Sequence, residues 1–220
     1  MERSFGFTTA VSEATTAIYA AHSEAAGARN GIGLVKLMGR HSGFIAAFAT
    51  LANSDVNFCL VPEVRFGLQS FLGSLEERLK TRHHAVVVVA EGAGQDLMKE
   101  ALERDASGNI RLGDIGIFLK DQITNYFKKA GMGVTLKYID PSYTIRSMPA
   151  SPPDSVLCLM LGHNAVHAGM AGRTSMVVGY WKGEFTHVPI AAAVSKRKEI
   201  DPQDKLWTGV ISSTGQPREM

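Results

Sequence analysis

The 220-residue sequence lacks most features that mark secreted or membrane-bound proteins. It has only two cysteines, Cys59 and Cys158, both inside apolar runs and without the spacing of metal ligands. We therefore predict buried, reduced thiols. No apolar segment reaches the roughly 20 residues of a membrane span, and no signal-peptide pattern opens the chain. The sequence predicts a cytoplasmic protein without a membrane partner.

The sequence also has little net charge. Its 23 basic residues are balanced by 21 acidic ones, and the net charge is only +2. This balance provides no field that would attract nucleic acid, so we predict no nucleic-acid partner. One tight basic cluster, Lys196-Arg197-Lys198, stands beside Glu199 and Asp201. We interpret it as an exposed loop.

Hydrophobic periodicity predicts alternating helices and strands along the chain. Helices are expected at 9–25, 43–52 (with Ser42 as N-cap), 70–80, 115–130 and 154–171, and strands at 32–37, 57–62, 85–90, 134–139, 175–180 and 184–188. The last two strands form a predicted hairpin. The others are short, mostly apolar runs between helices, a pattern typical of a parallel sheet covered on both faces.

The predicted fold is therefore α/β, a three-layer sandwich of helices on both sides of a mainly parallel sheet. With 45% hydrophobic residues, the chain has enough apolar material for a packed core. We place residues 1–190 in one domain and residues 191–220 in a C-terminal tail. Because Trp207 and Val210 are apolar residues within a polar tail, we expect the tail to pack on the domain.

One segment combines a strand end, an arginine and the start of a helix. The apolar run 32–37 is followed by Met38-Gly39-Arg40 and then by Gly43, where an alanine-rich helix is expected. An arginine fork suits phosphate or sugar oxygens, glycines let the backbone come close, and a helix start offers N–H groups to an anion. We therefore predict a ligand site at Met38, Gly39 and Arg40.

Polar side chains accompany two further predicted strands. Glu91 comes directly after the valine-rich strand, and Tyr143 and Arg146 follow the next one, which itself contains Lys137. Ligands of open α/β sheets bind beyond the carboxyl ends of the strands. The cations would hold a phosphate and the carboxylate would accept hydrogen bonds from hydroxyls. This set of residues suits a phosphorylated sugar.

Each of these residues also has an ordinary structural interpretation. Arg40 could form a salt bridge, and Glu91 could simply begin a helix. Tyr143 could pack as a half-buried residue, and Lys137 could face solvent from within its strand.

Two other patterns point to different chemistry. His163 and His167 are four residues apart on a predicted helix, where two imidazoles on one face could bind a metal. No glutamate adjoins His163 as in a zinc-protease motif and no third ligand is evident, so we interpret both as helix-packing or surface residues. The glycine pairs near 31 and 92 do not complete a dinucleotide-binding motif, which argues against a dehydrogenase.

The Leu-Met-Gly-Arg segment, with its following glycine and alanine-rich helix, resembles the sugar-phosphate-binding element of the 6-phosphofructokinase family. Residues 4–11, Ser-Phe-Gly-Phe-Thr-Thr-Ala-Val, are similar to the helix start that follows the family's catalytic loop. Residues 137–147, Lys-Tyr-Ile-Asp-Pro-Ser-Tyr-Thr-Ile-Arg-Ser, are similar to the ATP-dependent enzymes of plants and some protists. The resemblance spans nearly the whole chain in the family's order.

This resemblance implies phosphoryl transfer from ATP to the 1-hydroxyl of fructose 6-phosphate, giving fructose 1,6-bisphosphate in glycolysis. Such catalysis depends mostly on positioning and electrostatics. The implied cofactor is Mg²⁺ with ATP as co-substrate, and the implied assembly is a homo-oligomer. The implied fructose 6-phosphate-binding residues are Met38, Gly39, Arg40, Glu91, Lys137, Tyr143 and Arg146.

Two family motifs do not occur in the sequence: the Gly-Gly-Asp-Gly nucleotide loop and the Thr-Ile-Asp motif that carries the catalytic aspartate. In the family, the catalytic motif lies just upstream of Ser-Phe-Gly-Phe. We therefore expect the carboxyl-terminal portion of a longer enzyme, with a fold incomplete at its amino terminus and no catalytic residue. Two alternatives remain open: a non-catalytic sugar-phosphate-binding or subunit-interaction protein, and an enzyme that uses pyrophosphate as the donor.

We predict that the purified 220-residue chain alone has negligible kinase activity, because its sequence contains neither the phosphate loop nor the aspartate that would accept the hydroxyl proton. A coupled assay for fructose 1,6-bisphosphate, with an intact family enzyme as positive control, measures this. Turnover near the rate of the intact enzyme would contradict the prediction.

Overall fold

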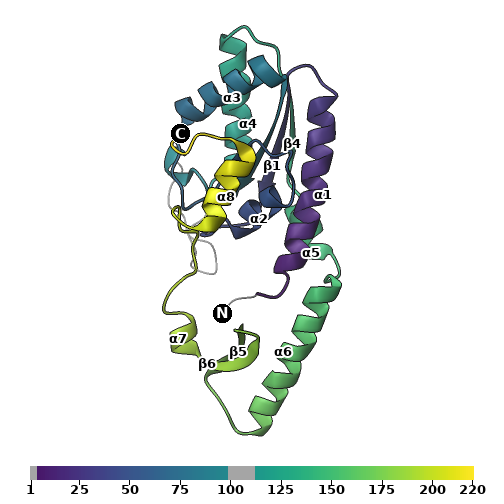
Figure 1. Cartoon of the computed structure of the whole chain (residues 1–220), viewed down its shortest axis with the longest axis vertical. Helices are drawn as coiled ribbons and strands as arrows, with labels where there is room; N and C mark the ends of the chain where they lie inside the picture. The colour runs from purple at the N-terminus through teal and green to yellow at the C-terminus, as the bar shows by residue number, and fades with distance from the viewer. Residues whose placement is uncertain (1–3, 99–111) are drawn as a thin grey trace. The chain divides into compact units, whose positions relative to one another are not determined.

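The structure is a computed structural model that describes residues 4–98 and 112–220. It divides into two compact units, a larger one of Val11–Arg146 with Glu199–Met220 and a smaller one of Met1–Ala10 with Ser147–Lys198. Figure 1 shows its elements, which are α1 (Phe7–Ala26), β1 (Gly31–Leu37), α2 (Phe44–Leu51), β2 (Phe58–Leu60), α3 (Leu68–Arg82), β3 (His84–Ala90), the 3₁₀ helix η1 (Gln95–Leu97), α4 (Ile115–Lys129), β4 (Thr135–Ile139), α5 (Ser142–Ser147), α6 (Pro152–Met170), β5 (Met176–Trp181), β6 (Glu184–Pro189), α7 (Ile190–Ala193) and α8 (Lys205–Thr214).

The larger unit is built on a parallel sheet with the strand order β2-β3-β1-β4. β1 lies between β3 and β4 and pairs with both, so that Leu34 is opposite Val87 on one side and Tyr138 on the other. β1 and β3 are almost wholly buried, as their apolar sequences predicted. Because the four strands are parallel, their carboxyl ends lie at one edge of the sheet.

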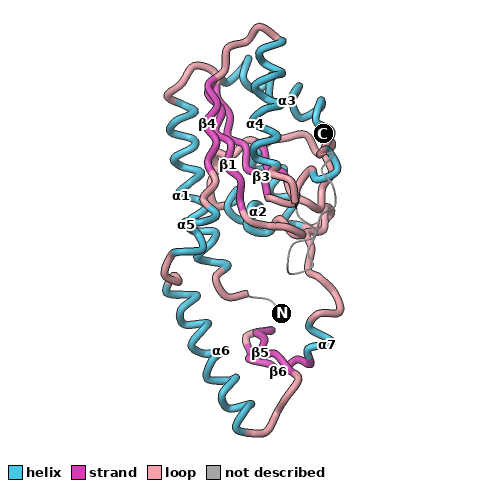
Figure 2. The backbone as a smooth tube through the Cα atoms, turned by 180° about the vertical axis from the view of Figure 1, so that it is seen from behind, coloured by secondary structure: helices cyan, strands magenta, loops and turns pink. Residues whose placement is uncertain are grey.

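Helices cover both faces of this sheet, as Figures 1 and 2 show. α3 and α4 pack on one face in a core that includes Phe71 and Leu119. α1 covers the other face so closely that a Cβ atom at Gly31 would lie 2.1 Å from the carbonyl oxygen of Ala25. α8 packs on α2 and buries Trp207. The predicted three-layer α/β sandwich is confirmed.

The smaller unit contains α6 and an antiparallel hairpin of β5 and β6. The hairpin turns at Lys182 and Gly183, which both have positive φ, and its prediction is confirmed. Asp154 is only 1% exposed. Its Oδ2 accepts hydrogen bonds from the backbone N and from Oγ1 of Thr9, both at 2.7 Å. This buried carboxylate therefore joins the start of α1 to the first turn of α6.

Several predictions of local structure are wrong. The N-cap of α2 is Gly43, not Ser42. α5 and α8 are helices in segments for which no helix was predicted. Cys59 is buried as predicted but Cys158 is exposed, because the apolar run around it winds into a helix and turns only Leu157 inward. The division of the chain at residue 190 stays a prediction.

The surface agrees with one further expectation, that of an exposed basic cluster. Lys196-Arg197-Lys198 is exposed outside any helix or strand. Within the described ranges 4–98 and 112–220, no helix is both long enough and apolar enough to span a lipid bilayer.

We predict that Gly31→Ala destabilises the chain, because the added Cβ would overlap the backbone of α1. Overpacking of this kind costs about 1–3 kcal/mol. Gly73→Ala is the matched control: its Cβ would meet nothing within 4 Å, and alanine in a helix gains about 0.5–1 kcal/mol over glycine. Equilibrium urea unfolding of the two variants measures both effects. Equal stability of the two variants would contradict the prediction.

Candidate functional site

Backbone contacts join the ends of β1 and β3. The N–H of Glu91 donates to the carbonyl of Leu37 at 2.9 Å, and the N–H of Gly92 donates to the carbonyl of Gly39 at 3.0 Å. The N–H of Gly39 points back at the Glu91 side chain, with 3.4 Å between N and Oε1. A Cβ at Gly92 would lie 1.9 Å from the carbonyl oxygen of Arg40, so only glycine permits this approach. The two predicted ligand-binding loops are therefore in direct contact.

A carboxylate occupies the start of α2. Both oxygens of Glu63 accept the backbone N–H of Gly43 at 3.0 Å, and Oε1 also accepts the N–H of Ile200 at 2.9 Å. This carboxylate takes the role that the sequence assigned to Ser42. Because the helix start is already matched with a negative charge, the Gly43 N–H does not point freely toward a ligand beside Arg40, as the sequence had suggested.

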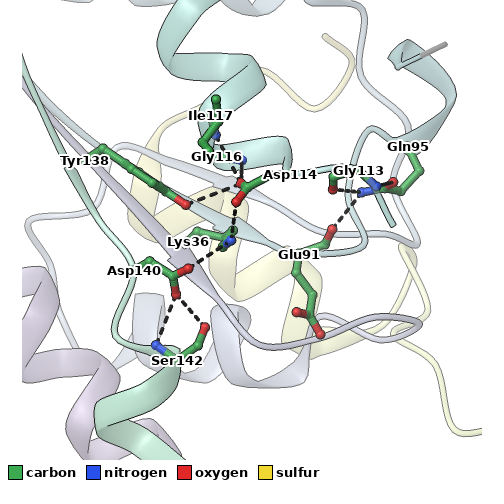
Figure 3. Close-up of polar contacts among 10 residues, drawn as sticks. All are labelled: Lys36, Glu91, Gln95, Gly113, Asp114, Gly116, Ile117, Tyr138, Asp140 and Ser142. Carbon is green, nitrogen blue, oxygen red and sulfur yellow. Dashed lines mark hydrogen bonds and ion pairs between the residues drawn. The ribbon is translucent and has the colours of Figure 1, made fainter. Parts of the chain in front are cut away.

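A second group of contacts centres on Lys36, near the carboxyl end of β1 (Figure 3). Its Nζ lies 2.9 Å from Oδ2 of Asp114 and 2.9 Å from Oδ2 of Asp140. Asp114 caps α4, accepting the N–H of Gly116 at 3.0 Å and of Ile117 at 3.1 Å. A single ammonium thus links the central strand β1 to the start of α4 and to the residue that follows β4.

Asp140 in turn contacts Ser142, the first residue of α5. Its Oδ1 accepts the backbone N–H of Ser142 at 3.1 Å and the Ser142 hydroxyl at 2.5 Å, as Figure 3 shows. Asp140 therefore connects Lys36 to the short helix that carries two predicted ligand-binding residues, Tyr143 and Arg146.

The charges of this cluster shift the pKa of each member. Burial alone would lower the pKa of Lys36, but its hydrogen bonds to Asp114 and Asp140 outweigh burial, and the pKa is raised. Burial would raise the pKa of both aspartates, but hydrogen bonds from Lys36 and from the capped backbone hold the pKa of each below its usual value. Burial raises the pKa of Tyr138 to about 12. The cluster is therefore a lysine cation between two carboxylates at neutral pH.

Gln95 holds the chain just before Asp114. Its side-chain amide donates to the carbonyl of Glu91 at 2.8 Å and to the carbonyl of Gly113 at 3.2 Å, and it accepts the N–H of Gly113 at 3.0 Å. These contacts, also drawn in Figure 3, connect the end of β3 to the start of α4.

The structure brings some predicted residues together and leaves one apart. Met38, Gly39, Arg40 and Glu91 lie at the joined ends of β1 and β3. Tyr143 and Arg146 lie on α5, and both are exposed. Lys137 lies inside β4 in register with Gly33, away from the strand ends, and its Nζ is 3.7 Å from a carboxylate oxygen of Glu24.

Sequence reasoning missed Lys36, Glu63, Gln95 and Asp114, and it treated Asp140 only as a turn former. Lys36 had a signal, since it is the one charged residue in the apolar run 32–37. Such a residue needs an opposite charge once the strand is buried. Glu63 had none, because its contact with Gly43 exists only in the folded chain.

The described residues do not fit a magnesium site. Within residues 4–98 and 112–220, no three His, Cys, Asp or Glu side chains are grouped so that they could hold a metal ion. His163 and His167 are both exposed on α6. The described residues therefore offer no set of ligands for the Mg²⁺ that the resemblance implies.

A pocket of about 330 Å³ lies at the opposite edge of the sheet. Asn30 and His83, which directly precede β1 and β3, are part of its lining. The pocket is therefore a strand's length away from Arg40 and Glu91, and the candidate site is defined by its polar contacts instead.

Residues 1–169 match the sequence pattern of one protein family, described as Phosphofructokinase. The chain belongs to the phosphofructokinase family. It is 50% identical over 230 aligned positions to an ATP-dependent 6-phosphofructokinase of Borreliella burgdorferi, with 100% of this chain and 52% of the relative covered. It is 48% identical over 228 positions to ATP-dependent 6-phosphofructokinase 1 of Arabidopsis thaliana, with 100% and 48% covered. The chain thus spans about half the length of these curated relatives.

Solved phosphofructokinase structures share the fold. A pyrophosphate-dependent phosphofructokinase from Marinobacter aquaeolei matches with a TM-score of 0.65 and 17% identity, covering 96% of this chain and 54% of that one. Phosphofructokinase from Saccharomyces cerevisiae matches with a TM-score of 0.61 and 19% identity, covering 94% and 25%. At these identities the likeness supports the phosphofructokinase fold.

We predict that Asp114 contributes to the loss of stability in acid. Its pKa in the folded chain is below the ordinary value of 3.8. The stabilisation that the Asp114 carboxylate contributes is therefore complete above the pKa that Asp114 has in the unfolded chain. It is lost as pH falls through the lower pKa that Asp114 has in the folded chain. Asp114→Asn keeps a capping side chain but cannot titrate, so this variant should lose less unfolding free energy between pH 6 and pH 2.5 than the unaltered chain.

Urea unfolding at a series of pH values measures this difference, and Asp121→Asn at an exposed position of α4 serves as the control. Identical pH profiles for the unaltered chain and Asp114→Asn would contradict the prediction.

Proposed function

We propose that this chain provides the fructose 6-phosphate-binding portion of an ATP-dependent 6-phosphofructokinase. The complete enzyme would transfer the γ-phosphoryl group of ATP to the 1-hydroxyl of fructose 6-phosphate, releasing fructose 1,6-bisphosphate and ADP. The observation that carries the proposal is the contact between the Gly39-Arg40 loop and Glu91, in a chain 50% identical to a relative of that name. The proposal includes a homo-oligomeric, cytoplasmic enzyme of glycolysis.

Each candidate residue has a role that fits its chemistry. The guanidinium groups of Arg40 and Arg146 would hold the sugar phosphate through paired hydrogen bonds. Glu91, whose Oε1 lies 3.4 Å from the N of Gly39, has further lone pairs to accept sugar hydroxyls. Gly39 has a φ of +144°, which favours glycine and leaves its backbone open to a close ligand approach.

Three further residues complete the assignment. Met38 and Tyr143 would form the walls of the sugar site. Lys137 would lie near the sugar phosphate, as the resemblance implies, although here it faces Glu24. Phosphoryl transfer depends on positioning, and in this proposal the described residues position the acceptor. The donor ATP and Mg²⁺ are not assigned to them.

The sequence identity to named relatives favours ATP over pyrophosphate as the phosphoryl donor. The relatives at 48–50% identity are named ATP-dependent, whereas the pyrophosphate-dependent enzymes are matched at 17% and 21% identity, which bears on fold alone.

Isothermal titration of the folded 220-residue chain with fructose 6-phosphate tests the proposal. We expect saturable binding, and we expect Arg146→Ala to weaken it about tenfold or more. A hydrogen bond to a charged group contributes about 1.5–3 kcal/mol, and every 1.4 kcal/mol is tenfold in affinity. Arg82→Ala, at another exposed arginine, should leave the affinity unchanged.

ATP is titrated separately against the same chain. Binding of fructose 6-phosphate that is lost in Arg146→Ala, without binding of ATP, supports an acceptor-binding portion. Circular dichroism establishes that the chain is folded, and a folded chain that fails to bind fructose 6-phosphate would overturn the proposal.

A further inference from the structure

We propose that Lys36 is a positioning residue of the fructose 6-phosphate site: its ammonium holds Asp140, and through Asp140 it fixes the helix α5. The inference rests on the proposed function, which assigns Tyr143 and Arg146 of α5 to the sugar phosphate. Lys36 itself does not touch the sugar in this assignment. It acts through the carboxylate that it binds.

Lys36 lies on the strand that leads into the candidate site. It belongs to the central strand β1 and precedes Met38 by two residues. Its side chain is only 12% exposed, and both of its carboxylate partners lie 2.9 Å from Nζ. Lys36 is therefore part of the strand that leads into the Gly39-Arg40 loop. Its ion pairs connect this strand to the residue that follows β4 and to the residue that precedes α4.

The helix α5 has few contacts of its own to hold it in place. This helix has only six residues, too few to be stable in isolation. Ile145, 7% exposed, is its one buried residue. At the first turn, Asp140 accepts both the N–H and the hydroxyl of Ser142. Tyr143 is 84% exposed, so burial of Ile145 and the contact of Ser142 with Asp140 are two of the anchors of this helix.

The ammonium of Lys36 also separates two negative charges. Asp114 and Asp140 both contact the same ammonium, so their carboxylates are close to one another. Removing the ammonium would leave two like charges in a partly buried place, which disfavours ionisation of both. The more mobile carboxylate would turn toward solvent. Asp114 accepts two backbone N–H groups of α4, whereas only one of the two hydrogen bonds that Asp140 accepts comes from the backbone, so Asp140 would give way and release α5.

The test compares Lys36→Met with Lys36→Arg and with the double variant Lys36→Met/Asp140→Asn. Methionine keeps the length of the side chain without the charge, arginine keeps the charge, and asparagine removes the repulsion while remaining able to cap Ser142. Lys80→Met is the matched control, because Lys80 also forms an ion pair, with Glu76 at 2.6 Å, on the distant helix α3.

Two measurements are made on each folded variant. Hydrogen–deuterium exchange reports the order of α5 against that of α3, and isothermal titration reports fructose 6-phosphate affinity. We expect Lys36→Met to speed exchange in α5 at least tenfold, to leave α3 unchanged and to weaken sugar-phosphate binding about tenfold. Lys36→Arg should keep the α5 exchange rate and the fructose 6-phosphate affinity of the unaltered chain. The double variant should recover part of what Lys36→Met loses, and Lys80→Met should change neither property.

Exchange in α5 also has an expected pH profile. In Lys36→Met, protonation of one aspartate relieves the repulsion, so α5 should become more protected as pH falls from 7 to 5. The unaltered chain should show no such gain, because Lys36 keeps both carboxylates ionised over that range.

The outcomes separate this inference from the proposed function. If the unaltered chain does not bind fructose 6-phosphate, the proposed function fails and the positioning role falls with it. If the unaltered chain binds and Lys36→Met binds equally well, the positioning role alone is overturned. General destabilisation, with faster exchange in α3 and α5 alike and no rescue by arginine, would also overturn it and leave Lys36 a structural ion pair.

Discussion

β1 forms backbone hydrogen bonds along both of its edges, to β3 and to β4, and runs in the same direction as both. This parallel pairing is the constraint on which the candidate site depends. It brings three strand ends to one edge of the sheet although the residues that follow them, Arg40, Glu91 and Asp140, are far apart in the sequence. Parallel neighbours must be joined by crossovers, and here the crossovers are helices that bury both faces. β1 and β3 can be almost wholly apolar because neither of their faces meets water.

A buried apolar strand restricts which charges it can carry. Lys36 is tolerated in β1 because it lies near the end of the strand, where Asp114 and Asp140 both reach its ammonium. Removing a charge from water costs several kcal/mol unless partners compensate. Two carboxylates around one lysine leave a net negative charge in the cluster. The N-terminus of α4, which Asp114 caps, offsets part of this charge, and Ser142 donates two hydrogen bonds to Asp140.

The parts of this protein that the sequence predicted are those that depend on local pattern. Glu91 and Arg40 could be found because each follows an apolar strand, and the order of elements then implied a parallel sheet. α5 could not be found, because six residues that include Thr144 and Ile145 have weak helix propensity. Its stabilising contacts include the hydrogen bonds of Ser142 to Asp140 and the burial of Ile145, and both form only in the folded chain.

Long-range contacts explain the remaining differences. Glu63 replaces Ser42 at the start of α2 because the chain returns to that helix 20 residues later, and no spacing rule relates a glutamate to a helix that precedes it. Cys158 lies in an apolar run, as Cys59 does, but its run is helical and turns only Leu157 inward. An apolar run predicts burial of every residue only when the element is a strand covered on both faces.

These contacts divide the proposed sugar site into two parts that differ in stiffness. The loops after β1 and β3 are joined by backbone hydrogen bonds of 2.9 and 3.0 Å, and Gly92 leaves no space between them. Backbone contacts of this kind have no rotamers to change, so the main chain around Gly39 and Glu91 forms the rigid part. α5 is held by side chains, through Lys36, Asp140 and Ser142 in series. The part of the proposed site that carries Arg146 therefore depends on side-chain contacts, whereas the part that carries Gly39 and Glu91 depends on backbone contacts.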